Sequence, residues 1–251
     1  MFALLSHQSL LIFLIGFVAS FLATTTGGIG LAVIPALMLF GLSPLQASAT
    51  LRLAITLGDF TGLHRLERAG KVVRPMILPV LLLGIAGALI GSFILLWTPG
   101  PLAEKLFSGF ILLTVGMSLL KPNFGLQSQH RQSQKKKAAG YTSIFFLSIL
   151  STYFTAATGL LGRTAIMLCF GQTFLESSAT RKVQSLGMGV TSTIIFIVSG
   201  SVHWTAAAVL VPAVTLGSLF GSAYAIRKGE RWVRNLFLIV VAATAIILLL
   251  K

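Results

Sequence analysis

Charged residues are scarce in this sequence, and acidic residues are the scarcest. Only 10% of its 251 residues are charged, and Asp and Glu together account for five of them. A water-soluble domain carries about 25% charged residues, because most of its surface must face water. The scarcity argues against an ordinary soluble fold and indicates a chain whose surface faces a bilayer.

Several features of enzymes and metal proteins are also absent. A single cysteine, Cys169, excludes a framework of intramolecular disulfides. The four histidines lack metal-ligand spacing, and the sequence holds no nucleophile elbow, no zinc-protease motif and no nucleotide-binding P-loop. We therefore expect no catalytic residue, no resident metal or cofactor, and no primary pump driven by a nucleotide.

Long apolar blocks dominate the chain instead. Hydrophobic residues make up 55% of it, and blocks of roughly 18 or more are long enough to cross a bilayer as helices. No Lys or Arg precedes Arg52, so we expect the first block to be retained rather than cleaved as a signal peptide. The sequence predicts an all-α polytopic membrane protein, with blocks at residues 10–23, 75–97, 102–120, 141–158, 204–226 and 233–250.

The second half of the sequence repeats the first at the offset that separates Phe40 from Phe170. Matched glycine, serine and threonine residues carry the evidence, because chance rarely keeps these residue types in register. We predict two transmembrane repeats, residues 1–121 and 140–251, joined by a polar and basic linker at residues 122–139. The matched positions are Gly41 and Gly171, Ser48 and Ser178, Thr50 and Thr180, Gly87 and Gly217, and Gly91 and Gly221.

Each repeat has about five hydrophobic segments, which gives eight to ten membrane segments in total. The second segment of each repeat is shorter than the roughly 20 residues that a span requires. It is interpreted either as a glycine-broken, re-entrant half-helix or as a short span, and both interpretations stay open at this stage. The segments of the first repeat lie at about 8–26, 31–42, 45–63, 75–97 and 102–120.

Equivalent loops of the two repeats carry opposite charge bias. Residues 65–74 are rich in Lys and Arg, whereas their counterparts at 199–203 have none. The bias is reversed in the next loop, where residues 227–234 are basic and residues 98–105 hold a single Lys. Cytoplasmic loops carry the excess of Lys and Arg. The sequence therefore predicts inverted-topology repeats, with both termini outside and the linker at 122–139 in the cytoplasm. The net charge of +14 could suggest a nucleic-acid partner, but we expect none, because the cations lie in short loops between apolar blocks.

A motif of threonine and glycine precedes the short segment of each repeat. Inverted repeats with interrupted helices hold substrate near the middle of the membrane. Glycine permits positive φ and close backbone approach, and the helix that follows favours an anion at its first N–H groups. The alternative is that the glycines only allow close helix packing. Their occurrence in both repeats favours substrate binding by Thr26, Gly27, Gly28 and Gly30, and by Thr158, Gly159 and Gly162.

Four cations lie inside or at the edge of apolar segments. A central Arg or Lys costs roughly 2.5–3.5 kcal/mol on insertion scales, and too few acidic residues lie nearby to balance all four. We expect Arg52 and Arg163 to bind an anionic substrate, because each is a single cation beside a repeat motif. For Arg181 and Lys182 we expect snorkelling to the membrane interface from a segment end.

One acidic residue, Asp59, is predicted on the same helix face as Arg52 and Thr56, because these residues are four and seven positions apart. A structural Arg52–Asp59 ion pair is the favoured interpretation. In the other, substrate displaces Asp59 from Arg52 and the carboxylate takes up a proton, since intramembrane carboxylates often mark proton paths. Asp59 is thus the candidate coupling residue.

These motifs resemble the sulfite exporter TauE/SafE family, also called the toluene sulfonate uptake permease family. The resemblance covers nearly the whole chain, with its two related halves, and implies a bacterial or archaeal inner-membrane protein that moves small sulfur-containing anions. The second repeat departs from the family pattern, with fewer glycines and with Ala165 where the first has Pro35. The resemblance rests on Gly27-Gly28-Ile29-Gly30, on Val33-Ile34-Pro35, and on the Ala49-Thr50 and Ala179-Thr180 elements.

The sequence as a whole predicts a secondary transporter of small sulfur-containing or organic anions, such as sulfite or sulfonates. Export is the expected direction. Its expected partners are the substrate anion, the lipid bilayer and protons as the coupling ion. Two alternatives stay open: an uncoupled anion channel or facilitator, and a membrane-embedded enzyme or assembly partner that transports nothing.

Overall fold

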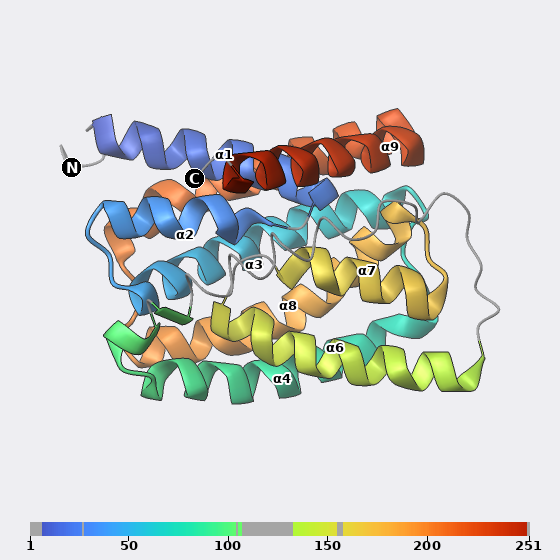
Figure 1. The fold of residues 1–251 in the computed structure, drawn as a ribbon, viewed down its shortest axis with the longest axis horizontal. Coiled ribbons are helices and arrows are strands. Elements are labelled where there is room, and N and C mark those ends of the chain that lie inside the picture. The colour runs from blue at the N-terminus through green and yellow to red at the C-terminus, as the bar shows by residue number, and fades with distance from the viewer. Residues whose placement is uncertain (1–6, 27, 104, 107–132, 155–157, 250–251) are drawn as a thin grey trace.

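The computed structural model describes residues 7–26, 28–103, 105–106, 133–154 and 158–249, and all regular structure in these ranges is helical (Figure 1). Most of the predicted fifth segment at 102–120 and most of the linker at 122–139 lie outside these ranges. The helices are α1 (His7–Thr26), α2 (Ile29–Leu39), α3 (Pro44–Arg68), the 3₁₀ turn η2 (Arg74–Met76), α4 (Ile77–Trp97), α6 (Gln134–Phe154), α7 (Thr158–Phe170), α8 (Phe174–Val198) and α9 (Trp204–Leu249).

Helices α2 and α7 are short, with 11 and 13 residues, as the sequence predicted for the second segment of each repeat. Pro35 lies inside α2, where its ring removes one backbone hydrogen-bond donor. Each short helix ends at a glycine in the left-handed region, Gly41 with φ 90° and Gly171 with φ 65°. That conformation suits glycine, which has no Cβ to clash, and it turns the chain into the long helix that follows.

The long helices α3 and α8 begin with matching capping boxes. Ser43 accepts a hydrogen bond from the backbone N–H of Gln46, whose side chain accepts one from the N–H of Ser43. Thr173 and Glu176 make the same reciprocal pair at the start of α8. These bonds satisfy backbone donors that a helix start leaves unpaired. The local structure around the two caps therefore repeats at the offset found in the sequence.

Helix packing is also matched between the two halves. Helices α3 and α8 lie against each other in the middle of the bundle, α1 and α9 form one side, and α4 and α6 form the other (Figure 1). Helix α9 packs on α1 and α3, and α4 packs on α6 and α8. The largest buried apolar cluster includes Ile34, Leu51, Phe196 and Leu210, which join α2, α3, α8 and α9.

Glycines bring the outer helices into backbone contact. A Cβ added at Gly87 of α4 would fall on Ser148 of α6, and one added at Gly217 of α9 would lie 2.8 Å from the Cβ of Ser20 in α1. Small residues at such crossings are typical of helices that pack in membranes.

Two of the described helical stretches are long and apolar enough to cross a membrane, Arg74–Trp97 and Trp204–Gly229. They occupy equivalent positions in the two halves. Large apolar side chains remain exposed on them, including Leu78 at 63%, Trp97 at 81% and Trp204 at 61%. Helix α9 kinks at Gly229, whose φ of 79° interrupts the helical backbone after the second of these stretches.

Alanine at either glycine crossing should destabilise the bundle. We expect Gly87→Ala and Gly217→Ala each to lower the free energy of unfolding by about 1–3 kcal/mol, because the added methyl group overpacks a backbone contact. Gly100→Ala is the matched control, since nothing lies within 4 Å of its added Cβ. Thermal unfolding in detergent measures the effect, and unfolding temperatures equal to that of the control would contradict the predicted role of the crossings.

Candidate functional site

A polar cavity of about 90 Å³ lies among α1, α3, α7, α8 and α9, with the end of α6 and the start of α2 beside it. A cavity that holds one water molecule has a volume of about 10–15 Å³ by the same measure. This cavity is several times larger, so it has room for a small polyatomic ion. Its lining residues are Ser20, Ala23, Ile29, Arg52, Ile55, Gly58, Asp59, Ser151, Thr158, Gly159, Arg163, Ser178, Arg181, Lys182, Ser185, Val214 and Ser218.

All four intramembrane cations identified in the sequence line this cavity. Arg52 and Arg163 are each 3% exposed and Lys182 is 8% exposed, while Arg181 is half-buried. The prediction that Arg181 and Lys182 reach the membrane interface is wrong, because both side chains turn inward from α8. Among the lining residues Asp59 is the one carboxylate, which leaves three positive charges in excess.

Two of the arginines are joined by the end of α6. Arg181 Nη2 donates to Ser151 Oγ at 2.7 Å, and Ser151 Oγ donates to Thr158 Oγ1 at 2.6 Å. Arg52 Nη2 donates to the backbone carbonyl of Ser151. Ser151 therefore holds guanidinium groups from both repeats beside the first residue of α7.

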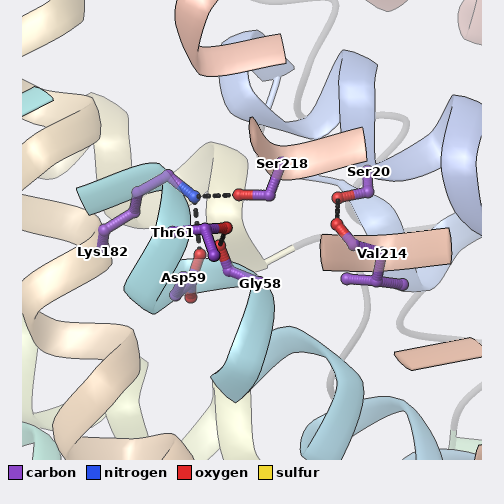
Figure 2. A network of polar contacts seen from close by, with 7 residues as sticks. All are labelled: Ser20, Gly58, Asp59, Thr61, Lys182, Val214 and Ser218. Atoms are coloured by element: carbon purple, nitrogen blue, oxygen red, sulfur yellow. Dashed lines mark hydrogen bonds and ion pairs between the residues drawn. The ribbon is translucent and has the colours of Figure 1, made fainter. Parts of the chain in front are cut away.

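The lysine is held by an ion pair between the central helices. Lys182 Nζ on α8 donates to Asp59 Oδ1 on α3 at 2.7 Å and to Ser218 Oγ on α9 at 3.0 Å, and Figure 2 shows the three side chains converging. The ion pair that Asp59 makes is thus with Lys182, in place of the predicted pair with Arg52. Gly62 provides the space, because a Cβ there would lie 2.7 Å from Lys182 Nζ.

The two glycine motifs lie at the cavity to different extents. In the second repeat Thr158 and Gly159 line it, and a Cβ at Gly162 would lie 2.9 Å from Arg181 Nε. In the first repeat Ile29 lines it, next to Gly28, the N-cap residue of α2, and Gly30, which is buried. Of the other predicted residues, Thr26 is the last residue of α1 and Gly27 lies outside the described residues.

Backbone conformation and close contact distinguish two of the motif glycines, Gly28 and Gly162. Gly28 has a φ of −113°, which other residues also adopt, so the expected left-handed backbone is absent at this position. The contact between Gly162 and Arg181 illustrates the other role of glycine, since a side chain there would displace the guanidinium.

Sequence reasoning missed the polar face of α8. Ser178, Arg181, Lys182 and Ser185 all line the cavity. Their spacing of three, four and seven residues places them on one side of a helix. That periodicity was a readable signal, because a polar stripe in an otherwise apolar segment faces protein or a water-filled space rather than lipid.

The chain is similar along most of its length to several proteins named as probable membrane transporters. A probable membrane transporter protein, ORF9, from Sinorhizobium is 28% identical over 97% of this chain and 93% of its own length. A probable membrane transporter protein from Haemophilus influenzae is 25% identical over 91% and 89%, and the probable membrane transporter protein YfcA from Escherichia coli is 23% identical over 92% and 86%. No solved structure matches the chain significantly.

The protein is a membrane transporter and not an enzyme. It belongs to the sulfite exporter TauE/SafE family, whose model matches residues 12–248, and the resemblance found in the sequence is thereby confirmed.

Leucine in place of Gly162 should impair the site without preventing insertion. Its side chain would occupy the space of the Arg181 guanidinium and break the bond to Ser151. We expect Gly162→Leu to abolish transport while the protein still reaches the membrane. Gly100→Leu is a control at an open position. Transport by Gly162→Leu at the rate of this control would show that this glycine is not needed for the site.

Proposed function

We propose that the protein exports small sulfur-containing anions, such as sulfite or sulfonates, and that the anion binds in the cationic cavity. The observation that carries the proposal is the excess of three positive charges among the residues that line one small cavity. Burying a charge is costly unless an opposite charge accompanies it. A bound anion supplies the opposite charge, and its binding lowers the free-energy cost of burying these cations together.

The chemistry of the lining favours an oxyanion. Guanidinium groups present paired N–H donors that match the oxygens of sulfonate, sulfite or carboxylate groups. The hydroxyl group of Ser185 lies on the same helix face as Arg181 and Lys182 and offers a further donor. The cavity volume of about 90 Å³ favours a small anion over a bulky organic one. The family description supports sulfite among the small oxyanions, and outward transport as the direction.

We further propose that the two halves are inverted repeats that move against each other around the cavity, in a bacterial or archaeal inner membrane. The matched packing of α4 with α6 and α8, and of α9 with α1 and α3, supports this arrangement. The charged residues that line the cavity come from both halves: Arg52 and Asp59 from the first, and Arg163, Arg181 and Lys182 from the second. Movement of one half against the other would therefore change the site.

Inverted topology can be tested by labelling in intact cells. In a Cys169→Ser background, Thr205→Cys should react with an impermeant maleimide, because the loop before it lacks basic residues and its side chain is exposed. Ser133→Cys, next to the basic run of the linker, should react only after permeabilisation. The reverse labelling pattern would contradict the proposed orientation.

The anion site can be tested by binding to the purified protein. Sulfite, sulfate, sulfoacetate and acetate are compared by calorimetry, and we expect the sulfur oxyanions to bind. Arg52→Gln should weaken their binding about ten- to a hundred-fold, since a hydrogen bond to a charged group contributes roughly 1.5–3 kcal/mol.

Arg65→Gln is the matched control, because Arg65 is exposed near the end of the same helix. An Arg52→Gln protein that binds with unchanged affinity would remove Arg52 from the site. Absence of binding for every anion tested would contradict the proposed function.

A further inference from the structure

We propose that Asp59 is an internal anion that holds Lys182 while the cavity is empty, and that an arriving substrate displaces it and causes it to take up one proton. This inference rests on the proposed function, because it assigns a role within the same anion site. It goes further by linking each bound anion to a proton through one carboxylate.

The geometry places Asp59 where a substrate oxygen would bind. Its Oδ1 atom lies 2.7 Å from Lys182 Nζ, and the two side chains are 12% and 10% exposed. Both residues line the cavity together with the three arginines, so a bound oxyanion lies within the same small space as the ion pair. The carboxylate and the substrate therefore compete for one ammonium group.

The ammonium group of Lys182 remains in place during this exchange. Ser218 Oγ accepts a second hydrogen bond from it at 3.0 Å (Figure 2). Gly62 leaves the space in which the ammonium group lies. Lys182 and Asp59 also come from different halves of the chain, on α8 and α3. Opening the ion pair therefore alters a contact between the two halves as well as the charge of the site.

Displacement leaves Asp59 buried beside a second anion. Both burial and a neighbouring like charge disfavour the ionised form of a carboxylate. The carboxylate then binds one proton from water, and it releases that proton when the anion leaves and the contact with Lys182 forms again. One proton therefore enters the site for each anion that enters it.

The other charged groups that line the cavity with Asp59 are all cations. Arg52 lies on the same helix, Arg163 comes from α7, and Arg181 and Lys182 come from α8. Helix α9 contributes the Ser218 hydroxyl. None of the residues that line the cavity from α1, α2 or α9 is charged. Arginine keeps its proton throughout the neutral range and lysine ordinarily does so, so a proton taken up on anion binding is assigned to the one carboxylate among these lining residues.

The sign of the pH dependence follows from this exchange. Acid protonates Asp59 and frees Lys182 for the substrate, so anion affinity should rise as pH falls. For one linked proton the dissociation constant changes by up to about tenfold per pH unit. In transport, the anion and the proton should cross the membrane in the same direction.

The test is sulfate binding by the purified full-length protein at several pH values across the neutral range, where the charge of sulfate is constant. Wild-type protein should bind sulfate more tightly at lower pH, and sulfate added in weak buffer should remove protons from solution. Asp59→Asn should bind at least as tightly as wild type, with an affinity that no longer changes with pH.

Glu176→Gln is the matched control, because it removes a carboxylate from α8 outside the cavity while its amide can still serve in the capping box. It should keep the wild-type pH dependence. Lys182→Gln should bind weakly with either Asp or Asn at position 59, because the ammonium group is the shared partner.

Three results are decisive. Wild-type binding that is independent of pH, without proton uptake, would overturn the inference and leave the proposed function intact. A folded Asp59→Asn protein that no longer binds sulfate would assign Asp59 a structural role and also overturn it. Wild-type protein that binds no sulfate at any pH would contradict the anion site itself.

Discussion

The excess of positive charge in one small cavity is the constraint on which the rest of the structure depends. Four cations and one carboxylate line it, in a chain whose residues are 55% hydrophobic. Insertion scales put each Arg or Lys at the centre of a membrane helix at roughly 2.5–3.5 kcal/mol. The hydroxyls of Ser151 and Ser218 and the carboxylate of Asp59 reduce that cost by hydrogen bonding. The remaining charge favours an anion from outside the chain.

The two halves share their architecture and differ in their charge. Caps, left-handed glycines and helix crossings recur at equivalent positions in both halves. The cations recur only in part, because Arg52 on α3 matches Lys182 on α8 at the repeat offset, whereas Arg163 and Arg181 have no basic counterpart in the first half. Helix packing in membranes depends on small residues rather than on charge. The shared backbone can therefore be kept while each half supplies different groups to the site.

Much of the fold could be predicted from local patterns, and the pairing within the site could not. The short second helices and their terminal glycines follow from segment length and from Gly41 and Gly171. The Asp59–Lys182 pair depends on how α3 crosses α8, a long-range contact that helix periodicity does not encode. Arg52 was the expected partner because it lies on the same helix as Asp59, where spacing is readable. The stripe from Ser178 to Ser185 was readable in principle and was missed because Arg181 and Lys182 were assigned to a segment end.

The central claim is that an anion occupies this cavity, and locating a bound anion tests it most directly. Crystals of the protein grown with selenate, a sulfate analogue whose selenium scatters anomalously, would show its position. The account predicts an anomalous peak within the cavity, with oxygens in hydrogen-bond contact with at least two of Arg52, Arg163, Arg181 and Lys182. Selenate bound elsewhere in the protein, with no anomalous signal in the cavity, would contradict it.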